Sequence, residues 1–235
     1  MKFETDIYSD KGGREVNEDS VNVCESEDGG FIAVLADGVG AHGGGDIASR
    51  IVVEKLSETS DRSDILSLYN GVNEAVLAAQ KPGIYMKSTA VMIEISESEG
   101  ITTARISNVG DSRCYMFRKN KIIFQTSDHS FPGLDLLRGK ITASEIRFHP
   151  GRNKLLRAIG SDNATPEVTQ IEVKKGDAFL LCSDGFWEYV DEKEMAKSLR
   201  KSRRPQDWIP SMLTIMKKRF PPDHDNCSAV AVRVM

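Results

Sequence analysis

The sequence lacks any apolar stretch long enough to cross a membrane. Its apolar runs, such as residues 31–36, fall far short of the roughly 20 residues that a transmembrane helix needs. The N-terminal segment MKFETDIYSD turns acidic at once and has no apolar centre of the kind that a signal peptide requires. We therefore expect no membrane insertion, and a cytoplasmic protein that is complete in itself.

An excess of positive charge is also missing. The chain has 31 Lys and Arg residues against 35 Asp and Glu residues, a net charge of −4. Proteins that bind nucleic acid through the phosphate backbone are usually basic. We therefore expect no nucleic-acid partner.

Soft metal ligands are few and scattered. The four cysteines, Cys24, Cys114, Cys182 and Cys227, form no C-x-x-C pair, and the four histidines do not cluster. This excludes the common zinc signatures and a thioredoxin-like redox motif. Two of the cysteines lie in apolar strand-like runs, so we expect buried structural thiols.

The order of periodic segments indicates an α+β fold. After a strand-like N-terminus comes the apolar strand 31–37, then a glycine-rich turn and helices over 46–58 and 64–81. Strands are expected at 88–96, 101–110, 112–119 and 121–126, joined by hairpins, and 169–184 is expected to be a hairpin turning at Lys175–Gly176. Thr142 and Glu145 match a capping box, helices follow at about 191–201 and 206–219, and the last strand is 227–234.

Strands and helices do not alternate as in a doubly wound parallel sheet. We predict a sandwich of two antiparallel β-sheets flanked by pairs of α-helices, forming a single domain over residues 1–235.

Six acidic residues lie at the ends of apolar strands. Asp37 and Asp184 each end a buried strand and precede a glycine, Asp225 precedes the last strand, and Asp111 lies between two strands. Glu18 and Asp19 precede the strand SVNVCE. A single aspartate in such a place is usually a turn former or a cap. Six of them, without a matching set of lysines or arginines, point instead to a site for hard cations, Mg²⁺ or Mn²⁺.

Eight motifs in order carry a family resemblance. They are R-E-V-N-E-D (14–19), A-D-G-V-G-A-H-G-G-G (36–45), S-T-A (88–90), N-V-G-D-S-R (108–113), S-D-H-S (127–130), H-P-G-R-N-K-L-L-R-A-I-G (149–160), C-S-D-G-F-W-E-Y-V (182–190) and D-N-C-S (225–228). On these motifs the chain resembles the metal-dependent Ser/Thr protein phosphatases of the PPM/PP2C family, in a bacterial form. The resemblance covers essentially the whole chain. It implies hydrolysis of phosphoserine and phosphothreonine in proteins by a metal-activated water, antagonising a Ser/Thr kinase.

The resemblance also implies roles for single residues. In the family two Mn²⁺ or Mg²⁺ ions share a bridging aspartate, which Asp37 matches, and the Gly38 carbonyl matches a backbone ligand. The resemblance further implies metal ligands at Glu18, Asp184 and Asp225, ligands of a third metal at Asp111, Asp184 and Glu188, and an arginine that binds the substrate phosphate at Arg14. It implies that Asp19 and Asn226 contact metal-bound water and that His42 supports the site from behind the ligands.

One segment and one position depart from a uniform family pattern. Residues 130–153 correspond to the family's flap, for which a substrate contact and a purely packed segment are equally open. Some members have a histidine two residues after the bridging aspartate as a proposed general acid, and here that residue is Val39.

Three rival readings stay open. Gly38, Gly40 and Gly43 spell the dinucleotide fingerprint G-x-G-x-x-G, but the element expected after the first helix is a second helix rather than the parallel strand that the fingerprint needs. A catalytically inactive scaffold is disfavoured because every assignable ligand is present. A highly selective phosphatase for one phosphoprotein shares the chemistry and differs only in its partner.

Overall fold

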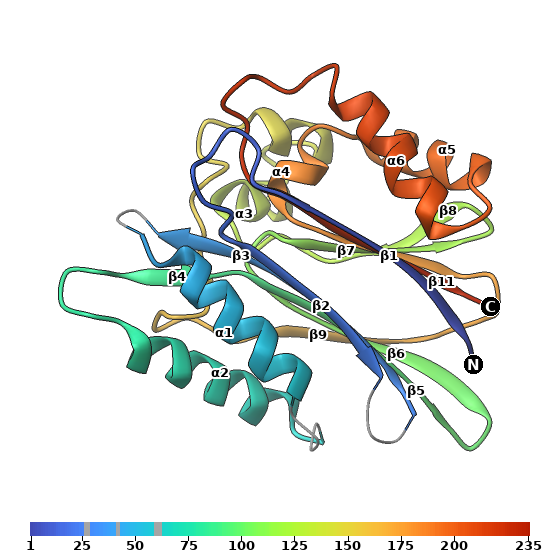
Figure 1. Ribbon diagram of the computed structural model, residues 1–235, viewed down its shortest axis with the longest axis horizontal. Helices are drawn as coiled ribbons and strands as arrows, with labels where there is room; N and C mark the ends of the chain where they lie inside the picture. Colours follow the sequence, from blue (N-terminus) through green and yellow to red (C-terminus); the bar gives the residue numbers. More distant parts are fainter. Residues whose placement is uncertain (26–28, 41–42, 59–62) are drawn as a thin grey trace.

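The computed structural model describes residues 1–25, 29–40, 43–58 and 63–235. Two antiparallel β-sheets lie face to face, and a pair of helices covers the outer face of each (Figure 1). The α+β sandwich predicted from the sequence is thereby confirmed. No helix of the described residues is long and apolar enough to span a membrane.

The first sheet joins the two ends of the chain. The register runs from Phe3 opposite Val234 to Asp10 opposite Cys227. The segment that follows the first strand and the segment that precedes the last strand therefore leave the sheet at the same end. In spatial order its strands are β1 (Phe3–Asp10), β11 (Cys227–Val234), β10 (Ala178–Cys182), β7 (Arg113–Arg118) and β8 (Lys121–Gln125).

The second sheet is built around its most apolar strand. Residues 31–36 are all buried, because one face of this strand packs against a helix and the other against the first sheet. In spatial order the strands are β2 (Asp19–Glu25), β3 (Phe31–Gly40), β5 (Ala90–Ser98), β6 (Ile101–Val109) and β9 (Glu167–Glu172), with β4 (Met86–Ser88) paired to the end of β3. Every partner of β3 is antiparallel, which contradicts the dinucleotide-binding rival.

Each helix pair buries one apolar stripe. The helices α1 (Gly45–Glu58) and α2 (Ile65–Ala79) pack Val52, Leu56 and Tyr69 against the second sheet. The helices α5 (Glu192–Lys201) and α6 (Pro205–Met216) cover the first sheet, where Trp208 meets Phe117 edge-on at 5.1 Å. The third apolar cluster lies between the two sheets.

The hairpin predicted within 169–184 is wrong. Its two strands, β9 and β10, belong to different sheets. The turn between them is held by the buried Asp177, which accepts hydrogen bonds from Arg118 of β7 at 2.7 and 2.9 Å and from the Lys174 amide at 2.7 Å. These contacts fix the turn as a crossing from one sheet to the other.

The break between β6 and β7 is likewise a crossing and not a hairpin. Gly110 has φ +95°, and a Cβ there would meet the Thr89 side chain at 2.7 Å. Because glycine alone fits this position easily, the chain turns tightly here and presents Asp111 at the end of the sandwich.

The flap forms a small lobe above that end. It contains α3 (Phe131–Leu137) and the 3₁₀-helix η1 (Ala143–Phe148). The capping box predicted from the sequence begins η1, where the Glu145 carboxylate accepts a hydrogen bond from the Thr142 amide at 2.7 Å. The short helix α4 (Asp184–Trp187) follows β10 beside it. Cys114, Cys182 and Cys227 are free, buried thiols, as expected, and Cys24 is partly exposed.

Candidate metal centre

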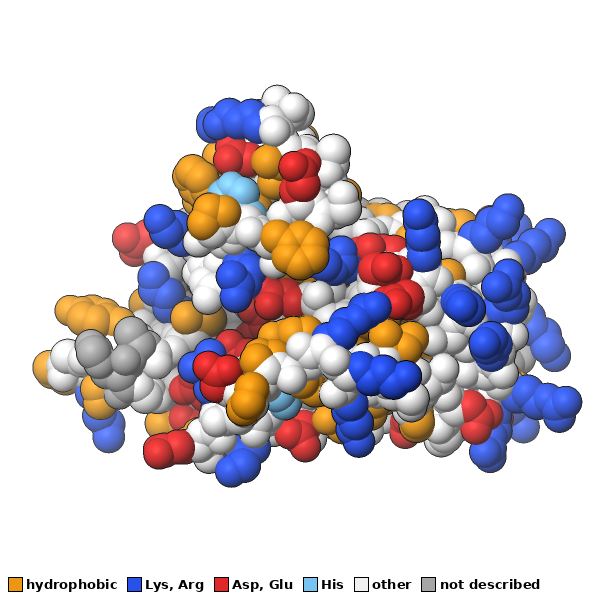
Figure 2. Space-filling model, turned by 90° about the horizontal axis from the view of Figure 1, so that it is seen from above, with side chains coloured by type: hydrophobic (Ala, Val, Ile, Leu, Met, Phe, Trp, Pro, Cys, Tyr) orange, Lys and Arg blue, Asp and Glu red, His pale blue; other side chains and the backbone are white. Residues whose placement is uncertain are grey.

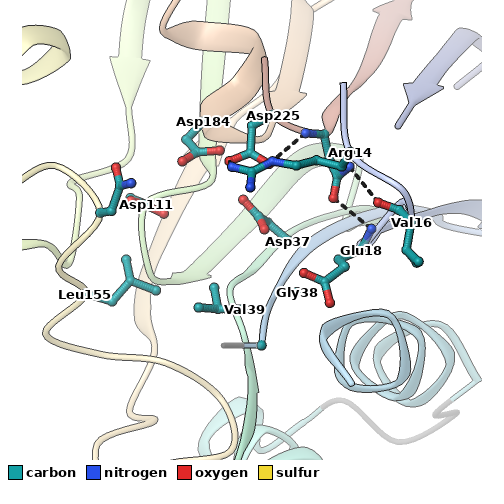
Figure 3. Close-up of a pocket in the computed structure, with 13 residues that line it drawn as sticks. Arg14, Val16, Glu18, Asp37, Gly38, Val39, Asp111, Leu155, Asp184 and Asp225 are labelled. Carbon is teal, nitrogen blue, oxygen red and sulfur yellow. Dashed lines mark hydrogen bonds and ion pairs between the residues drawn. The ribbon is translucent and has the colours of Figure 1, made fainter. Parts of the chain in front are cut away.

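A cavity of about 360 Å³ opens at the end of the sandwich where the motif aspartates meet (Figure 3). Asp37 comes from β3, Asp184 from the start of α4, and Asp111 and Asp225 from the segments before β7 and β11. The full lining is Arg14, Val16, Glu18, Asp37, Gly38, Val39, Gly40, Asp111, Asn153, Leu155, Asp184, Asp225 and Asn226. Residues far apart in sequence thus form one acidic pit.

The carboxylates repel one another. Burial, followed by the charges of Asp184, Asp19 and Asp111, holds the pKa of Asp37 well above its usual range. Burial and the Asp225 charge raise the pKa of Asp184, and burial and the Asp184 charge raise that of Asp111. Without a cation these carboxyl groups therefore stay protonated to higher pH than ordinary carboxyl groups do. This is expected of a cluster of acidic residues that binds cations.

Glu18 and Gly38 are locked to the start of α1. The Gly38 amide donates to the Glu18 carbonyl at 3.0 Å, and the Gly45 amide donates to the Glu18 carboxylate at 3.1 Å. A Cβ on Gly38 would lie 2.0 Å from the Gly45 carbonyl oxygen, so no other residue fits there without movement of the backbone. Burial raises the pKa of Glu18 as well.

Asp19 lies behind Asp37, its partner across the β2–β3 pair. It is 7% exposed; one carboxylate oxygen accepts from the Ser183 hydroxyl at 2.9 Å, and the other has no hydrogen-bond partner. Burial raises its pKa to about 7. A buried oxygen without a partner is costly, and a nearby cation or its water would satisfy it.

Asn226 lies in the cavity lining and holds the neighbouring loop through both ends of its side-chain amide. Its carbonyl oxygen accepts from the Glu18 amide at 2.8 Å, and its NH₂ group donates to the carbonyls of Lys11 and Val16. Both ends of the amide are therefore used to brace the loop that carries Arg14 and Glu18. The contact of Asn226 with metal-bound water stays a prediction.

Glu188 is not drawn into the cavity. It forms an ion pair with Arg152 of the flap at 2.8 Å, and burial and the Asp184 charge raise its pKa to about 7. The role of Glu188 as a ligand of a third cation stays a prediction, and it would require this side chain to leave Arg152. Asp111 does line the cavity, and its backbone carbonyl accepts from the Trp187 indole at 3.0 Å. His42 lies outside the described residues.

The donor set fits hard cations. Among the described residues no three Asp, Glu, His or Cys side chains already stand close enough together to enclose an ion, so ligation requires the cavity carboxylates to turn inward. The cavity offers carboxylate and backbone oxygens and no nitrogen or sulfur ligand in its described lining. Together with the raised pKa values and the unpartnered Asp19 oxygen, this favours Mn²⁺ or Mg²⁺ over zinc.

Comparison with known proteins decides the family. The family model described as protein phosphatase 2C matches residues 9–219. The serine/threonine phosphatase stp of Listeria monocytogenes is 32% identical over 214 residues, which cover 84% of this chain and 83% of that protein. The chain belongs to the protein phosphatase 2C family. The family and the enzyme class predicted from the sequence are confirmed.

Solved phosphatases share the whole fold. The serine/threonine phosphatase of S. agalactiae is 27% identical, with a TM-score of 0.86 and 100% of both chains covered. The catalytic domain of the phosphatase PstP, in complex with two manganese ions, is 26% identical, with a TM-score of 0.81 and 99% of both chains covered. The sandwich of this phosphatase is thus similar to one that is known to hold two cations.

A brace behind the site was missed from the sequence, although its residues lie in quoted motifs. The buried Arg113 forms a two-point ion pair with Asp128 at 2.7 and 2.8 Å, and its guanidinium lies 3.5 Å from the centre of the Trp187 ring. Because the Trp187 indole holds the Asp111 carbonyl, this brace positions one wall of the cavity. Arg113 and Asp128 lie in the motifs N-V-G-D-S-R and S-D-H-S, but the sequence does not indicate that their side chains form an ion pair.

Replacing Arg113 by methionine should destabilise the phosphatase strongly. Asp128, whose side chain is 2% exposed, would be left as a buried charge without its partner, which costs about 3–5 kcal/mol. The double variant Arg113→Met with Asp128→Leu should recover most of this loss. Urea unfolding measures both, and equal stability of the single and double variants would contradict a paired charge.

Proposed function

We propose that the chain hydrolyses phosphoserine and phosphothreonine in proteins at a centre of two Mn²⁺ or Mg²⁺ ions. The observation that carries this is a cavity whose described lining brings together five carboxylates and a single cation, Arg14. Glu18, Asp37, the Gly38 carbonyl, Asp184 and Asp225 would hold the two ions, and Asp111 with Asp184 would hold any third. When bound, the ions would neutralise phosphate charge and lower the pKa of a water molecule held between them.

The chain's own residues bind and orient the substrate. Arg14 donates to Asp225 at 2.9 Å, and its side chain is 56% exposed at the cavity mouth. Its planar fork suits two phosphate oxygens at once, which a lysine cannot match. Val16, Val39 and Leu155 supply the apolar part of the described cavity lining.

Arg14→Ala should raise KM for a phosphothreonine peptide by about tenfold and leave kcat within about twofold, because it removes a binding contact that is made before the chemical step. The KM of Arg14→Lys should lie between those of wild type and Arg14→Ala, because lysine keeps the positive charge but lacks the planar guanidinium. Lys11→Ala, an exposed cation in the same loop outside the cavity, is the matched control. An unchanged KM in Arg14→Ala would remove Arg14 from the phosphate site.

The biological setting is proposed on the same basis. We infer one catalytic domain over residues 1–235 with a flap at about 130–153, acting in the cytoplasm against a Ser/Thr kinase and its targets. The relatives named above are serine/threonine phosphatases, which supports phosphorylated proteins as the substrate class.

The direct test is phosphate release from a phosphothreonine peptide. It is run with Mn²⁺, with Mg²⁺ and with EDTA, and wild type is compared with Asp184→Asn. We expect metal-dependent release that the variant loses. No release by folded protein that still binds the cation would favour the alternative, an inactive or highly selective regulator of one phosphoprotein partner.

A further inference from the structure

Positive charge is concentrated at one side of an otherwise acidic molecule. Residues 193–219 contain nine Lys and Arg residues and two acidic residues, a net charge of +7, so the rest of the chain carries −11. Figure 2 shows blue side chains gathered at the right of the view, over α5 and α6. The charge is therefore a local surface feature and not a property of the whole chain.

Most of this charge forms a row along α5, which we call the basic track. It consists of Lys193, Lys197, Arg200, Lys201 and Arg203, all exposed. The first four share one face of the helix, because positions three and four residues apart lie above one another. Met195 and Leu199 on the opposite face are buried in the core. The ion pairs of the described residues include none of the five, whereas the neighbouring acids are already used: Glu194 by Arg219, and Glu192 by Arg147.

The basic track leads to the catalytic cavity. A groove of about 880 Å³ lies between η1 of the flap and the start of α5, and Lys193, Arg219 and the 83%-exposed Phe148 line it. Arg147 and Arg152 also line it, each paired with a glutamate of the groove, Glu192 and Glu188, and Asp191 lies at its edge. Arg152 faces this groove, and the next residue, Asn153, lines the metal cavity. The groove therefore connects the track to the place where a substrate phosphate would lie.

We propose that the basic track and the groove dock an acidic segment of the phosphoprotein substrate that flanks the phosphorylated residue. This rests on the proposed function and adds a substrate preference to it. From Lys193 to Lys201 the helix rises about 12 Å, which an extended peptide covers with about four residues. The occupant is thus a short acidic run, separated from the phosphoresidue by the length of the groove.

The surroundings favour a protein segment over a membrane or nucleic acid. None of the large apolar side chains exposed in the described residues lies within 190–220, so the basic track itself has nothing to insert into lipid, and Phe148 is the one such side chain in the described lining of the groove. A long polyanion that followed the track would meet the acidic remainder of the molecule, whereas a short acidic run contacts the track alone.

The test compares phosphothreonine peptides that carry four glutamates or four glutamines on either side of the phosphoresidue, separated from it by an uncharged spacer long enough to span the groove. At low salt we expect kcat/KM to be about 5–10-fold higher for a glutamate peptide than for its glutamine match, and this ratio should fall towards one as salt screens the charges. The variant Lys197→Glu, Arg200→Glu, Lys201→Glu should lose the ratio and keep wild-type turnover of the glutamine peptides. The control variant Lys2→Glu, Lys81→Glu, Lys175→Glu makes the same charge change at exposed sites outside the track and should keep the ratio.

Binding is measured separately from catalysis. A fluorescent, unphosphorylated four-glutamate peptide should bind wild type and the control variant, and bind the track variant at least about fivefold more weakly. A ratio that survives in the track variant, or equal binding by all three proteins, would overturn the proposal. Sedimentation with phosphatidylserine vesicles in place of peptide binding would overturn it in favour of a membrane surface. Failure to hydrolyse the glutamine peptides would instead refute the proposed function, and the binding arm would still decide the track.

Discussion

Replacing Asp37 with asparagine should abolish turnover and at the same time make the metal-free protein more stable. The two effects have one cause. Asp37 lies among Asp19, Asp111 and Asp184, and burial and their charges hold its pKa well above the usual range. A neutral amide of the same shape removes that repulsion, but it also removes the anionic ligand proposed to bridge the two cations.

We expect kcat for a phosphothreonine peptide to fall by at least about 10³-fold. In EDTA near neutral pH, the melting temperature of Asp37→Asn should exceed that of wild type by about 3–6 °C. Calorimetric or fluorescence melting with and without Mn²⁺ measures the second effect, and Mn²⁺ should stabilise the wild type far more than the variant. Asp162→Asn, an exposed aspartate outside the cavity, should change neither quantity. Wild-type turnover, or a metal-free variant that melts below wild type, would refute this account of Asp37.

The strongly periodic elements could be predicted from the sequence because their signals are local. The run of residues 31–36 is apolar at every position, and the structure buries all of it as the central strand β3. The helices near 46–58 and 191–201 carry one apolar stripe each, and both are present. These patterns arise because apolar residues recur on whichever faces of a strand or helix are buried, and that recurrence is visible in the sequence.

Pairing between strands could not be predicted in the same way. The breaks before Arg113 and before Ala178 look like hairpin turns, yet both strands cross to the other sheet. What decides each crossing is a contact with a distant segment: Gly110 against Thr89, and Asp177 with Arg118. Turn residues indicate that the chain changes direction, but they do not indicate which strand the next segment will pair with.

For the functional site, too, the positions of residues along the strands could be predicted, whereas the directions of their side chains could not. The positions of Asp37, Asp184 and Asp225 at strand ends are visible in the sequence, and all three line the cavity. The direction of a side chain is set by partners remote in the chain, such as Arg152 for Glu188. For this reason a residue four positions after a cavity aspartate turns away from the cavity, and Asn226 braces a loop 208 residues earlier.

The stability of the phosphatase should depend on pH in opposite directions with and without metal. Asp19, Asp37, Asp111 and Asp184 all have a folded-state pKa above the unfolded value, and that of Asp19 is raised to about 7. Groups of this kind contribute stability fully below their unfolded pKa of about 3.9, and lose it as pH rises through the folded pKa. In EDTA the contribution of this cluster should therefore fall between about pH 5 and pH 8.

Of the carboxylates outside the cavity, Glu188 contributes stability that also falls within this window because its pKa is raised to about 7, but it does so in wild type and in Asp37→Asn alike. Glu194 and Glu192 have lowered pKa values, so the stability they contribute is present above an unfolded pKa of about 4.3 and changes only at lower pH. His129, whose burial lowers its pKa, adds stability as pH rises past about 6.5, but it does so equally in wild type and in Asp37→Asn. The difference in melting temperature between these two proteins isolates the cluster.

In EDTA this difference should widen from pH 5 to pH 8, with the variant increasingly the more stable. With saturating Mn²⁺ its sign should reverse, because the cation binds the deprotonated carboxylates and the protons that compete with it are fewer at higher pH. The melting temperature gained by wild type on adding Mn²⁺ should accordingly grow with pH. A gain that is flat across this window would mean that cation and protons do not compete for the same oxygens, and that the cavity carboxylates are not the metal site.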